Sequence, residues 1–372
     1  MRLCFLAPAD SIHSKKWTEY FAKQGHEVYW LSFGVGGDEI PEGIKFYLIK
    51  KFPLRPLRPF SYTVNLRKIL SKIKPDIFHV HQVWMAGIMG ALVNFHPLVL
   101  TAWGSDVLLI PKSKLKKPLV KFALRRADLI TCDAWHVQEA MIKLGASSQK
   151  IKIVCFGIDT KKFSPDSEDE NLTRELKIQN CPIVISLRSF KSIYDIETLI
   201  RAIPPVLKEF PRAKFIIVGE GPEEDKIKNL AKDLGILDNT RFVGSVPNEE
   251  LPKYLRVSDV YVSTALSDAG IAASTAEAMA CCLPVVITNT GENERWVKDR
   301  ESGFLIPVKK PEILAEKIVY LLRDENKRKK FGNLARKKII EENDYYKEMA
   351  KMENLYKEIL EKIHERKTNF IF

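Results

Sequence analysis

The sequence predicts an α/β protein built from two doubly wound parallel-sheet domains. Three observations support this fold class. The 372 residues exceed one typical domain, short apolar runs alternate with amphipathic segments, and an acidic polar stretch interrupts that alternation near the middle of the chain. Apolar residues make up 45% and charged residues 28% of the sequence, so each domain can bury a core. These proportions exclude a disordered, collagenous or coiled-coil chain.

Six apolar runs in the first half of the chain predict buried strands. Segments with helical spacing lie between several of these runs, and such alternation predicts a parallel sheet that helices cover on both faces. The first run, within MRLCFLAPAD, is too short for a signal peptide and is better explained as a strand. The predicted strands are residues 3–7, 27–32, 77–81, 98–102, 129–132 and 151–155.

The alternation restarts after the segment SPDSEDENLTR, residues 164–174, whose polar and acidic composition is typical of a linker. The second set of predicted strands is residues 183–187, 214–218, 240–243, 260–263 and 284–288. Residues 343–366 then combine many charges with apolar residues at helical spacing, which predicts a long amphipathic helix. Its apolar positions are Met349, Met352, Leu355, Ile359 and Ile363.

These boundaries predict an N-terminal domain over residues 1–165, a linker over 166–180, a C-terminal domain over 181–342 and a final helix over 343–372. In α/β sheets, ligands bind at the carboxyl ends of the strands. Two such sheets in tandem therefore predict a ligand-binding cleft between the domains.

The excess positive charge is confined to the first half of the chain. Residues 1–165 hold 25 Lys and Arg against 12 Asp and Glu, whereas the remaining 207 residues hold 34 against 35. This asymmetry favours an anionic partner such as a phospholipid headgroup, a lipid phosphate or nucleic acid, although a solvated basic face has the same composition. The cations concentrate at Lys50, Lys51, Arg55, Arg58, Lys112, Lys114, Lys116, Lys117, Lys121, Arg125 and Arg126.

Two segments of the second domain could bind a phosphorylated ligand. In FIIVGEGP, Gly219 and Gly221 would let the backbone approach a phosphate, although a tight turn without a ligand explains them equally well. In DAGIAASTAEAMACCLP, residues 269–271 offer amides at a predicted helix start. Glu277 follows among small apolar residues, where a bond to ribose hydroxyls would offset the cost of burying its carboxylate; a surface ion pair is the alternative.

Arg188, at the end of a predicted strand, has the planar guanidinium that suits diphosphate oxygens. Lys191 follows closely and is more simply explained as a solvated loop charge. In the first domain, TAWGSD ends a strand with the composition of a binding loop, and its Asp106 could instead cap a helix. His79 and His81 lie on one face of a strand as core or cleft histidines.

Several other classes of site are disfavoured. We expect no metal site, because no acidic or histidine cluster has metal-ligand spacing. GxSxG and GxxxxGK[ST] are absent, and a dinucleotide fingerprint would need glycine where Glu224 stands, which argues against a hydrolase, a P-loop NTPase and an NAD-dependent oxidoreductase. Six cysteines without CxxC spacing and no apolar run of about 20 residues predict a cytoplasmic protein without a membrane-spanning helix.

The order of ten short motifs resembles the family 4 glycosyltransferases over nearly the whole chain. The motifs are KQGHEV at 23–28, PDIFHVH at 75–81, TAWGSDV at 101–107, RRADLIT at 125–131, FGIDTKKFSP at 156–165, GEGP at 219–222, RFVG at 241–244, SDVYVS at 258–263, EAMACCLPVV at 277–286 and SGFLIP at 302–307.

This resemblance implies a GT-B fold, with two Rossmann-like domains facing a cleft, and transfer of a sugar with retention and without a metal. It implies that Arg188 stabilises the diphosphate leaving group, Glu277 holds the ribose and Asp106 lies near the reacting sugar. The other implied donor-binding residues are Lys191, Gly219, Gly221, Arg241, Val246, Asp268, Ala269, Gly270 and Ile271. The implied acceptor-side residues are Ser11, His13, His81 and Trp103.

Two positions depart from the family pattern. Where relatives carry a first glutamate, eight residues before Glu277, this chain has Ala269 preceded by Asp268, and the position of a second lysine falls on Tyr194. The sequence therefore predicts a retaining glycosyltransferase with a nucleoside-diphosphate sugar as donor substrate and no cofactor. Its acceptor would be a lipid-linked molecule or a polysaccharide at the inner face of a membrane, with no nucleic-acid partner. The alternative is a non-catalytic scaffolding subunit of a glycan-assembly system.

Overall fold

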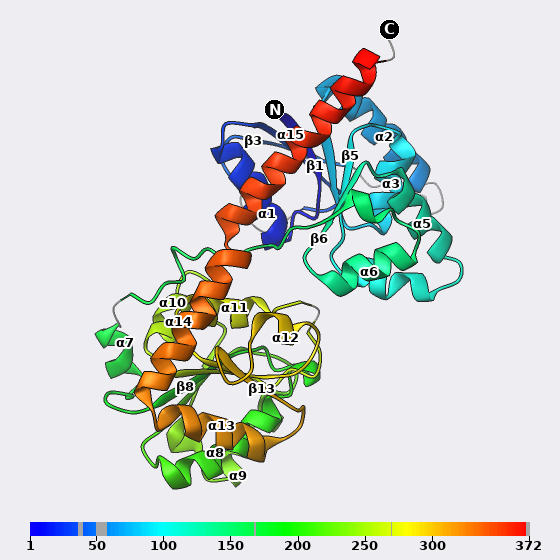
Figure 1. Cartoon of the computed structure of the whole chain (residues 1–372). Coiled ribbons are helices and arrows are strands. Elements are labelled where there is room, and N and C mark those ends of the chain that lie inside the picture. The colour runs from blue at the N-terminus through cyan, green and yellow to red at the C-terminus, as the bar shows by residue number, and fades with distance from the viewer. Residues whose placement is uncertain (36–39, 50–57, 167–168, 269, 370–372) are drawn as a thin grey trace. The chain divides into compact units, whose positions relative to one another are not determined.

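The computed structural model describes residues 1–35, 40–49, 58–166, 169–268 and 270–369. The chain divides into two compact units, one formed by Met1–Phe156 with Tyr346–Phe372 and the other by Gly157–Tyr345. Each unit is a parallel sheet with helices on both faces (Figure 1). The predicted fold class, two Rossmann-like α/β domains, is therefore confirmed.

The described part of unit 1 contains a seven-stranded parallel sheet in the order β3-β2-β1-β4-β5-β6-β7. Its strands are β1 (Arg2–Leu6), β2 (Glu27–Ser32), β3 (Ile44–Leu48), β4 (Ile77–His81), β5 (Leu98–Thr101), β6 (Leu129–Cys132) and β7 (Ile151–Ile153). The direction of winding reverses between β1 and β4, which makes their carboxyl ends the topological switch point of this sheet. The sequence did not predict β3, an edge strand that is only partly buried.

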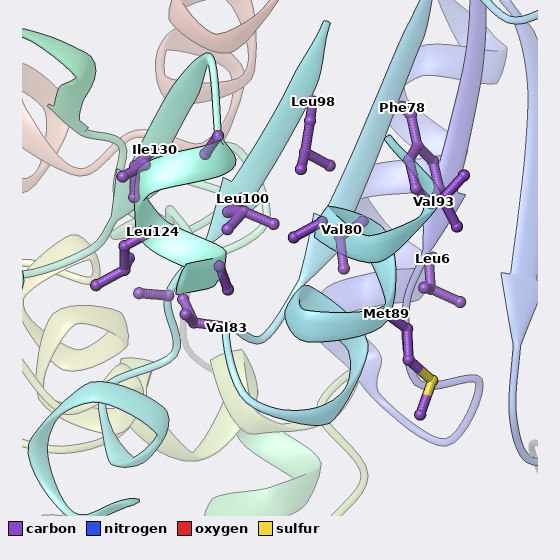
Figure 2. Packing of buried hydrophobic residues seen from close by; sticks show 14 of the residues in the cluster. Leu6, Phe78, Val80, Val83, Met89, Val93, Leu98, Leu100, Leu124 and Ile130 are labelled. Atoms are coloured by element: carbon purple, nitrogen blue, oxygen red, sulfur yellow. The ribbon is translucent and has the colours of Figure 1, made fainter. Parts of the chain in front are cut away.

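Side-chain alternation along the strands divides the core of unit 1 into two layers. Cys4 and Leu6 of β1 face one layer, in which Val80, Leu98 and Leu100 pack with Leu124 of a covering helix (Figure 2). The helices are α1 (Ile12–Lys23), α2 (Arg58–Ile73), α3 (Met85–Val93), α4 (Ser105–Leu108), α5 (Lys117–Arg126), α6 (Trp135–Lys143) and α15 (Tyr345–Asn369), with short 3-10 turns η2 (Ile110–Lys112) and η3 (Ser148–Lys150).

The other face of this sheet packs against α1 and α15. Phe5 of β1 stacks on Phe21 of α1, with ring centroids 5.8 Å apart, and Tyr356 of α15 lies 5.3 Å from the same ring. Figure 1 shows α15 running beside α1. Met349, Met352, Leu355 and Ile359, four of the five apolar positions expected on this helix, are buried.

The described part of unit 2 contains a six-stranded parallel sheet in the order β10-β9-β8-β11-β12-β13, with its switch point between β8 and β11. Its strands are β8 (Ile183–Leu187), β9 (Lys214–Val218), β10 (Thr240–Gly244), β11 (Val260–Ser263), β12 (Val285–Thr288) and β13 (Gly303–Ile306). Across both units, each predicted strand is present to within two residues. The sequence missed β13, a four-residue edge strand that begins with glycine.

Helices on both faces of the second sheet complete unit 2. They are α7 (Glu170–Glu175), α8 (Ile196–Glu209), α9 (Glu224–Asp233), α10 (Leu251–Arg256), α11 (Ala273–Ala280), α12 (Asn293–Trp296), α13 (Pro311–Leu322) and α14 (Glu325–Glu342), with 3-10 turns η4 (Ser192–Tyr194) and η5 (Leu237–Asn239). The segment expected to be a linker differs from expectation, because it contains α7 within unit 2. The Asp169 carboxylate caps this helix by accepting hydrogen bonds from two of its first amides.

Candidate functional site

The first candidate site lies at the switch point of the second sheet, where Arg188 follows β8. The Arg188 side chain is buried, with 7% of the residue exposed, and its Nη2 donates to Oδ1 of Asp268 at 2.6 Å. Asp268 follows β11, the neighbour of β8 across the switch point. The guanidinium also lies over the Tyr194 ring, 4.2 Å from its centroid. Burial raises the pKa of Asp268, and the neighbouring Arg188 guanidinium opposes that shift.

Gly219 and Gly221 bring two loops of this site into close contact. A Cβ atom on Gly219 would lie 2.5 Å from the carbonyl oxygen of Arg188, and one on Gly221 would lie 2.6 Å from that of Phe190. Gly219 also has a φ of +143°. The glycines are therefore required for the backbone after β9 to pack against the backbone after β8. Their packing role positions Arg188 whether or not a phosphate binds here.

Helix α11 connects this ion pair to Glu277. The hydroxyl of Tyr261, on β11, lies 2.8 Å from Oγ of Ser274 in the first turn of α11, and both Arg188 and Asp268 act electrostatically on this tyrosine. One turn later, Glu277 is buried, with 6% exposed, and its Oε1 accepts a hydrogen bond from Asn248 Nδ2 at 3.1 Å. Arg188 and Glu277 are thus linked through one strand and one helix.

Four polar atoms around this edge are buried without a hydrogen-bond partner among the described residues. They are Nε of Arg188, Oγ of Ser263, Oγ1 of Thr290 and Oδ1 of Asn293. These groups follow or end β8, β11 and β12. Leaving a buried polar group unsatisfied costs about 1–3 kcal/mol, so such groups usually have a ligand or ordered water as partner. The grouping of these four unpaired atoms at one edge of the sheet indicates a candidate binding site for a polar molecule.

The structure brings some of the predicted donor residues to this edge and not others. Gly270 and Ile271 lie in the turn just before Ala272, the N-cap of α11, Val246 follows β10, and Lys191 is exposed in the loop after β8. Ala269 lies outside the described residues. Arg241 is at the opposite, amino end of β10, where its guanidinium donates to the carbonyl oxygens of Leu176, Asp238 and Thr240. The structure therefore separates Arg241 from the other predicted donor residues.

The second candidate site lies at the switch point of the first sheet. The His13 ring, on α1, is 4.3 Å from the Phe156 ring and 6.0 Å from the Trp103 ring, and His81, at the end of β4, is 5.9 Å from Trp103. Three of the four predicted acceptor-side residues thus form one aromatic cluster. Ser11, the fourth, is the residue that precedes α1.

Polar atoms inside this aromatic cluster also lack partners among the described residues. They are both ring nitrogens of His81, the indole nitrogens of Trp17 and Trp103, and Oγ of Ser14. Burial lowers the pKa of His81 to about 3 and also lowers the pKa of His13, so both rings are neutral at physiological pH. An uncharged cluster of aromatic rings with several unpaired hydrogen-bonding groups has the chemistry that suits a hydroxyl-rich neutral ligand.

Asp106 is buried behind the Trp103 loop. Its carboxylate accepts hydrogen bonds from the amides of Val83 at 2.6 Å and Trp103 at 3.1 Å, and it thereby ties the loop after β4 to the loop after β5. Burial raises the pKa of Asp106, and these amide bonds oppose the shift. Asp106 does not cap a helix as the sequence allowed. Its carboxylate faces the backbone of the loops after β4 and β5.

Other contacts at the two sites were not apparent from the sequence. Asn248 binds Glu277, Trp17 forms a wall of the His81 cluster at 5.0 Å, and Tyr194 covers Arg188. Only Tyr194 carried a signal, because it occupies the position of the family's second lysine. In the sequence, Asn248 and Trp17 have no feature that distinguishes them from other loop and helix residues. Their roles follow only from their positions in the fold.

Further observations concern parts of the chain outside the two candidate sites. Within the described residues, no group of three His, Cys, Asp or Glu is arranged to hold a metal ion, and no helix has both the length and the apolar character to span a membrane. A groove of about 1080 Å³ between α8 and α13 lies away from both switch points and is lined mainly by exposed charged side chains. Lys50, Lys51 and Arg55 lie outside the described residues, as does the side chain of Arg58.

Comparison with known proteins identifies the family. Residues 167–338 match the family model "Glycosyl transferases group 1", and residues 2–134 match "Glycosyl transferase 4-like". The fold and both matches define a glycosyltransferase of the GT-B class. The chain belongs to the group 1, family 4 glycosyltransferases, as its motifs indicated.

The similar curated proteins include several glycosyltransferases. N-acetyl-alpha-D-glucosaminyl L-malate synthase of Bacillus anthracis is 22% identical over 91% of each chain. A GDP-mannose-dependent phosphatidylinositol monomannoside mannosyltransferase of Mycolicibacterium smegmatis is 28% identical over 51% of this chain and 52% of its own length. Among solved structures, Anabaena Alr3699/HepE in complex with UDP has a TM-score of 0.81 at 18% identity, covering 96% of this chain and 100% of that chain.

Proposed function

We propose that this glycosyltransferase moves a sugar from a nucleoside-diphosphate donor to a lipid-linked or glycan acceptor, with retention and without a metal. The observation that carries the proposal is the buried Arg188 at the switch point of the second sheet, where it is paired with Asp268 across the reversal of strand order. A buried arginine at this position offers a planar cation for the diphosphate leaving group.

The donor would bind by replacing groups that now occupy the site. Its diphosphate would take the place of the Asp268 carboxylate on Arg188 and engage Arg188 Nε, while the amides before α11 would face the phosphate or sugar. Glu277 would accept hydrogen bonds from the ribose hydroxyls. Negative charge develops on the diphosphate as the bond from the anomeric carbon breaks, and fixed cations and amides stabilise it there without a metal.

The acceptor would bind in the aromatic cluster of unit 1. Its walls, Trp103, Trp17 and the neutral ring of His81, suit the apolar face and the hydroxyls of a sugar. Asp106 would act as a positioning residue that fixes the Trp103 loop. The choice of a lipid-linked acceptor is supported by the cations of the first half of the chain and by the glycolipid named for the mycobacterial relative. A protein working on such an acceptor would be cytoplasmic and peripheral at a membrane.

The ion pair also supports a second candidate, a subunit that keeps the fold without turnover. The Asp268 carboxylate is paired with Arg188, the cation that a donor diphosphate would need. In addition, Ala269 stands where relatives carry a glutamate. Such a subunit would bind a nucleotide weakly or not at all and would not release a nucleoside diphosphate from any donor sugar. Turnover therefore separates the two candidates.

The test is release of nucleoside diphosphate by the purified full chain from a panel of UDP and GDP sugars. We expect release from at least one donor, and a loss of about 10²–10³-fold in kcat on Arg188→Ala, because removing one fixed group that stabilises developing charge has an effect of this size. Glu277→Ala should chiefly raise KM for the donor.

The matched control is Arg201→Ala, which removes a half-exposed arginine of α8 that is paired with Glu197. Thermal unfolding of every variant distinguishes a loss of activity at the site from a loss of folded protein. Arg188→Lys is a second control, because it retains the positive charge that Arg188→Ala removes. Turnover that survives Arg188→Ala intact would contradict the assigned role of Arg188. Absence of turnover with every donor would favour the non-catalytic candidate.

A further inference from the structure

A strongly basic surface of unit 1 extends from η2 along α5. Residues 107–127 contain seven Lys and Arg and no Asp or Glu. Among the described residues, no carboxylate forms an ion pair with Lys112, Lys114, Lys117, Lys121 or Arg125, whereas many lysines elsewhere are paired. We call residues 109–125 the α5 surface. Uncompensated cations at this density attract an anionic partner.

The α5 surface also exposes apolar side chains between its cations. Leu115 is 87% exposed, Leu109 56%, Leu119 46% and Phe122 37%. Leu115, Leu119 and Phe122 are spaced by four and three residues, so they follow one stripe from the preceding turn along α5. The opposite face of the helix, with Val120, Ala123 and Leu124, is buried in the core, where Figure 2 shows Leu124. The exposed leucines therefore contribute little to the fold.

A groove beside this stripe brings the cations together. It has a volume of about 490 Å³ and is lined by Lys114, Lys117, Pro118, Lys121, Phe122 and Arg125. The turn at Gly145, after α6, lies against the ends of Lys121 and Arg125. The groove thus combines two apolar residues, Pro118 and Phe122, with four cationic side chains, which matches a phosphate headgroup whose glycerol and acyl carbons continue into an apolar phase.

We propose that the α5 surface docks on an anionic phospholipid bilayer. Lys114, Lys117, Lys121 and Arg125 bind headgroup phosphates, while Leu115 and Leu119 enter the interfacial layer. Exposed leucines favour a bilayer over nucleic acid, because they have no partner on a phosphate backbone. This inference deepens the proposed lipid-linked acceptor, on which it rests for its biological meaning.

The position of the α5 surface in the sequence fits the proposed acceptor site at the aromatic cluster. Trp103 is followed by the short helix α4 and then directly by Leu109, so the α5 surface begins six residues after one wall of the aromatic cluster. A sugar headgroup on a lipid seated at the α5 surface would therefore have a short path to Trp103 and His81 within the same unit.

The experiment is co-sedimentation of the full chain with vesicles, which requires no turnover. We expect binding to vesicles of phosphatidylglycerol and phosphatidylcholine in low salt, no binding to pure phosphatidylcholine, and strong weakening at ~1 M salt, where the screening length falls to about 3 Å. The triple variant Lys114→Gln, Lys117→Gln, Lys121→Gln should bind roughly a hundredfold more weakly, since each lysine near an anionic membrane contributes about fivefold. Leu115→Ser with Leu119→Ser should weaken binding at unchanged charge.

The control variant carries Lys208→Gln, Lys232→Gln and Lys330→Gln, which remove the same amount of charge from exposed sites of unit 2. This variant should bind vesicles as the unmodified chain does. Vesicle binding by the triple lysine variant that equals binding by the unmodified chain would overturn the proposal. So would vesicle binding that inorganic phosphate or an oligonucleotide abolishes, if the leucine variant binds as well as the unmodified chain. Donor hydrolysis in solution, measured in parallel, should be unchanged in the triple variant. A failure of the transferase assignment would therefore appear in hydrolysis, and a failure of docking only in sedimentation.

Discussion

At the residue scale, the defining feature of unit 2 is an arginine that is already paired. Arg188 and Asp268 lie 80 residues apart in the sequence and meet because β8 and β11 are neighbours at the switch point. Each was predicted separately as a donor residue, but the pairing depends on the strand order, which the sequence does not display. The ring of Tyr194 then fixes the guanidinium plane, as a stacked aromatic does for arginine.

We expect Asp268→Asn to strengthen binding of a nucleoside diphosphate. The substitution keeps the size of the side chain and removes the charge that competes with the diphosphate for Arg188, so UDP or GDP should bind about tenfold more tightly, a change of about 1.4 kcal/mol. Isothermal titration calorimetry with the free nucleotide measures this directly.

Asp233→Asn, which removes an exposed carboxylate at the end of α9, is the matched control and should leave the affinity unchanged. Weaker nucleotide binding by Asp268→Asn would show that the ion pair holds Arg188 in its binding geometry and does not compete with the ligand.

At the element scale, the packing of α15 against the first sheet includes contacts that the sequence predicts and others that it does not. The apolar spacing predicted its buried stripe, but not the hydrogen bond of 2.5 Å between Tyr356 Oη and Nδ1 of His79, whose Nε2 contacts Thr101 Oγ1 at 2.6 Å. Periodicity reports which face of a helix is apolar. It cannot report a polar pair made with a strand 277 residues earlier.

Tyr356→Phe should lower the unfolding free energy of unit 1 by about 1–3 kcal/mol, because it leaves a buried histidine nitrogen without its partner. Urea unfolding followed by tryptophan fluorescence is suitable, since five of the six tryptophans are in unit 1. The exposed Tyr346 of the same helix provides the comparison Tyr346→Phe, for which we expect a change under about 0.5 kcal/mol. Equal effects of the two substitutions would contradict the structural role of the His79 contact.

At the scale of the whole molecule, titratable side chains are unevenly divided between the units. All seven histidines belong to unit 1, and burial lowers the pKa of His13, His79 and His81. The charge asymmetry along the chain was visible in the sequence. The neutral state of these histidines was not, because it depends on which rings the folded unit buries.

This division predicts that unit 1 is the acid-sensitive unit. In the unfolded chain His81 would bind a proton below pH about 6.5, whereas in the folded chain it stays neutral down to about 3. The unfolding free energy should therefore be intact above pH about 6.5 and fall below it, by about 1.4 kcal/mol per pH unit for each such histidine.

Unfolding at a series of pH values, read by tryptophan fluorescence, tests this expectation. His81→Phe removes one titrating group and should flatten the dependence between pH 6.5 and about 3. A dependence equally steep in that variant would show that His81 does not carry the effect.

The most direct test of the central claim is a crystal structure of the chain with a nucleoside diphosphate. The diphosphate should lie within hydrogen-bond distance of the Arg188 guanidinium, with Asp268 displaced from Nη2 and the ribose hydroxyls at Glu277. A nucleotide bound elsewhere, or one bound in unit 2 while the Arg188–Asp268 pair stays closed, would contradict the account.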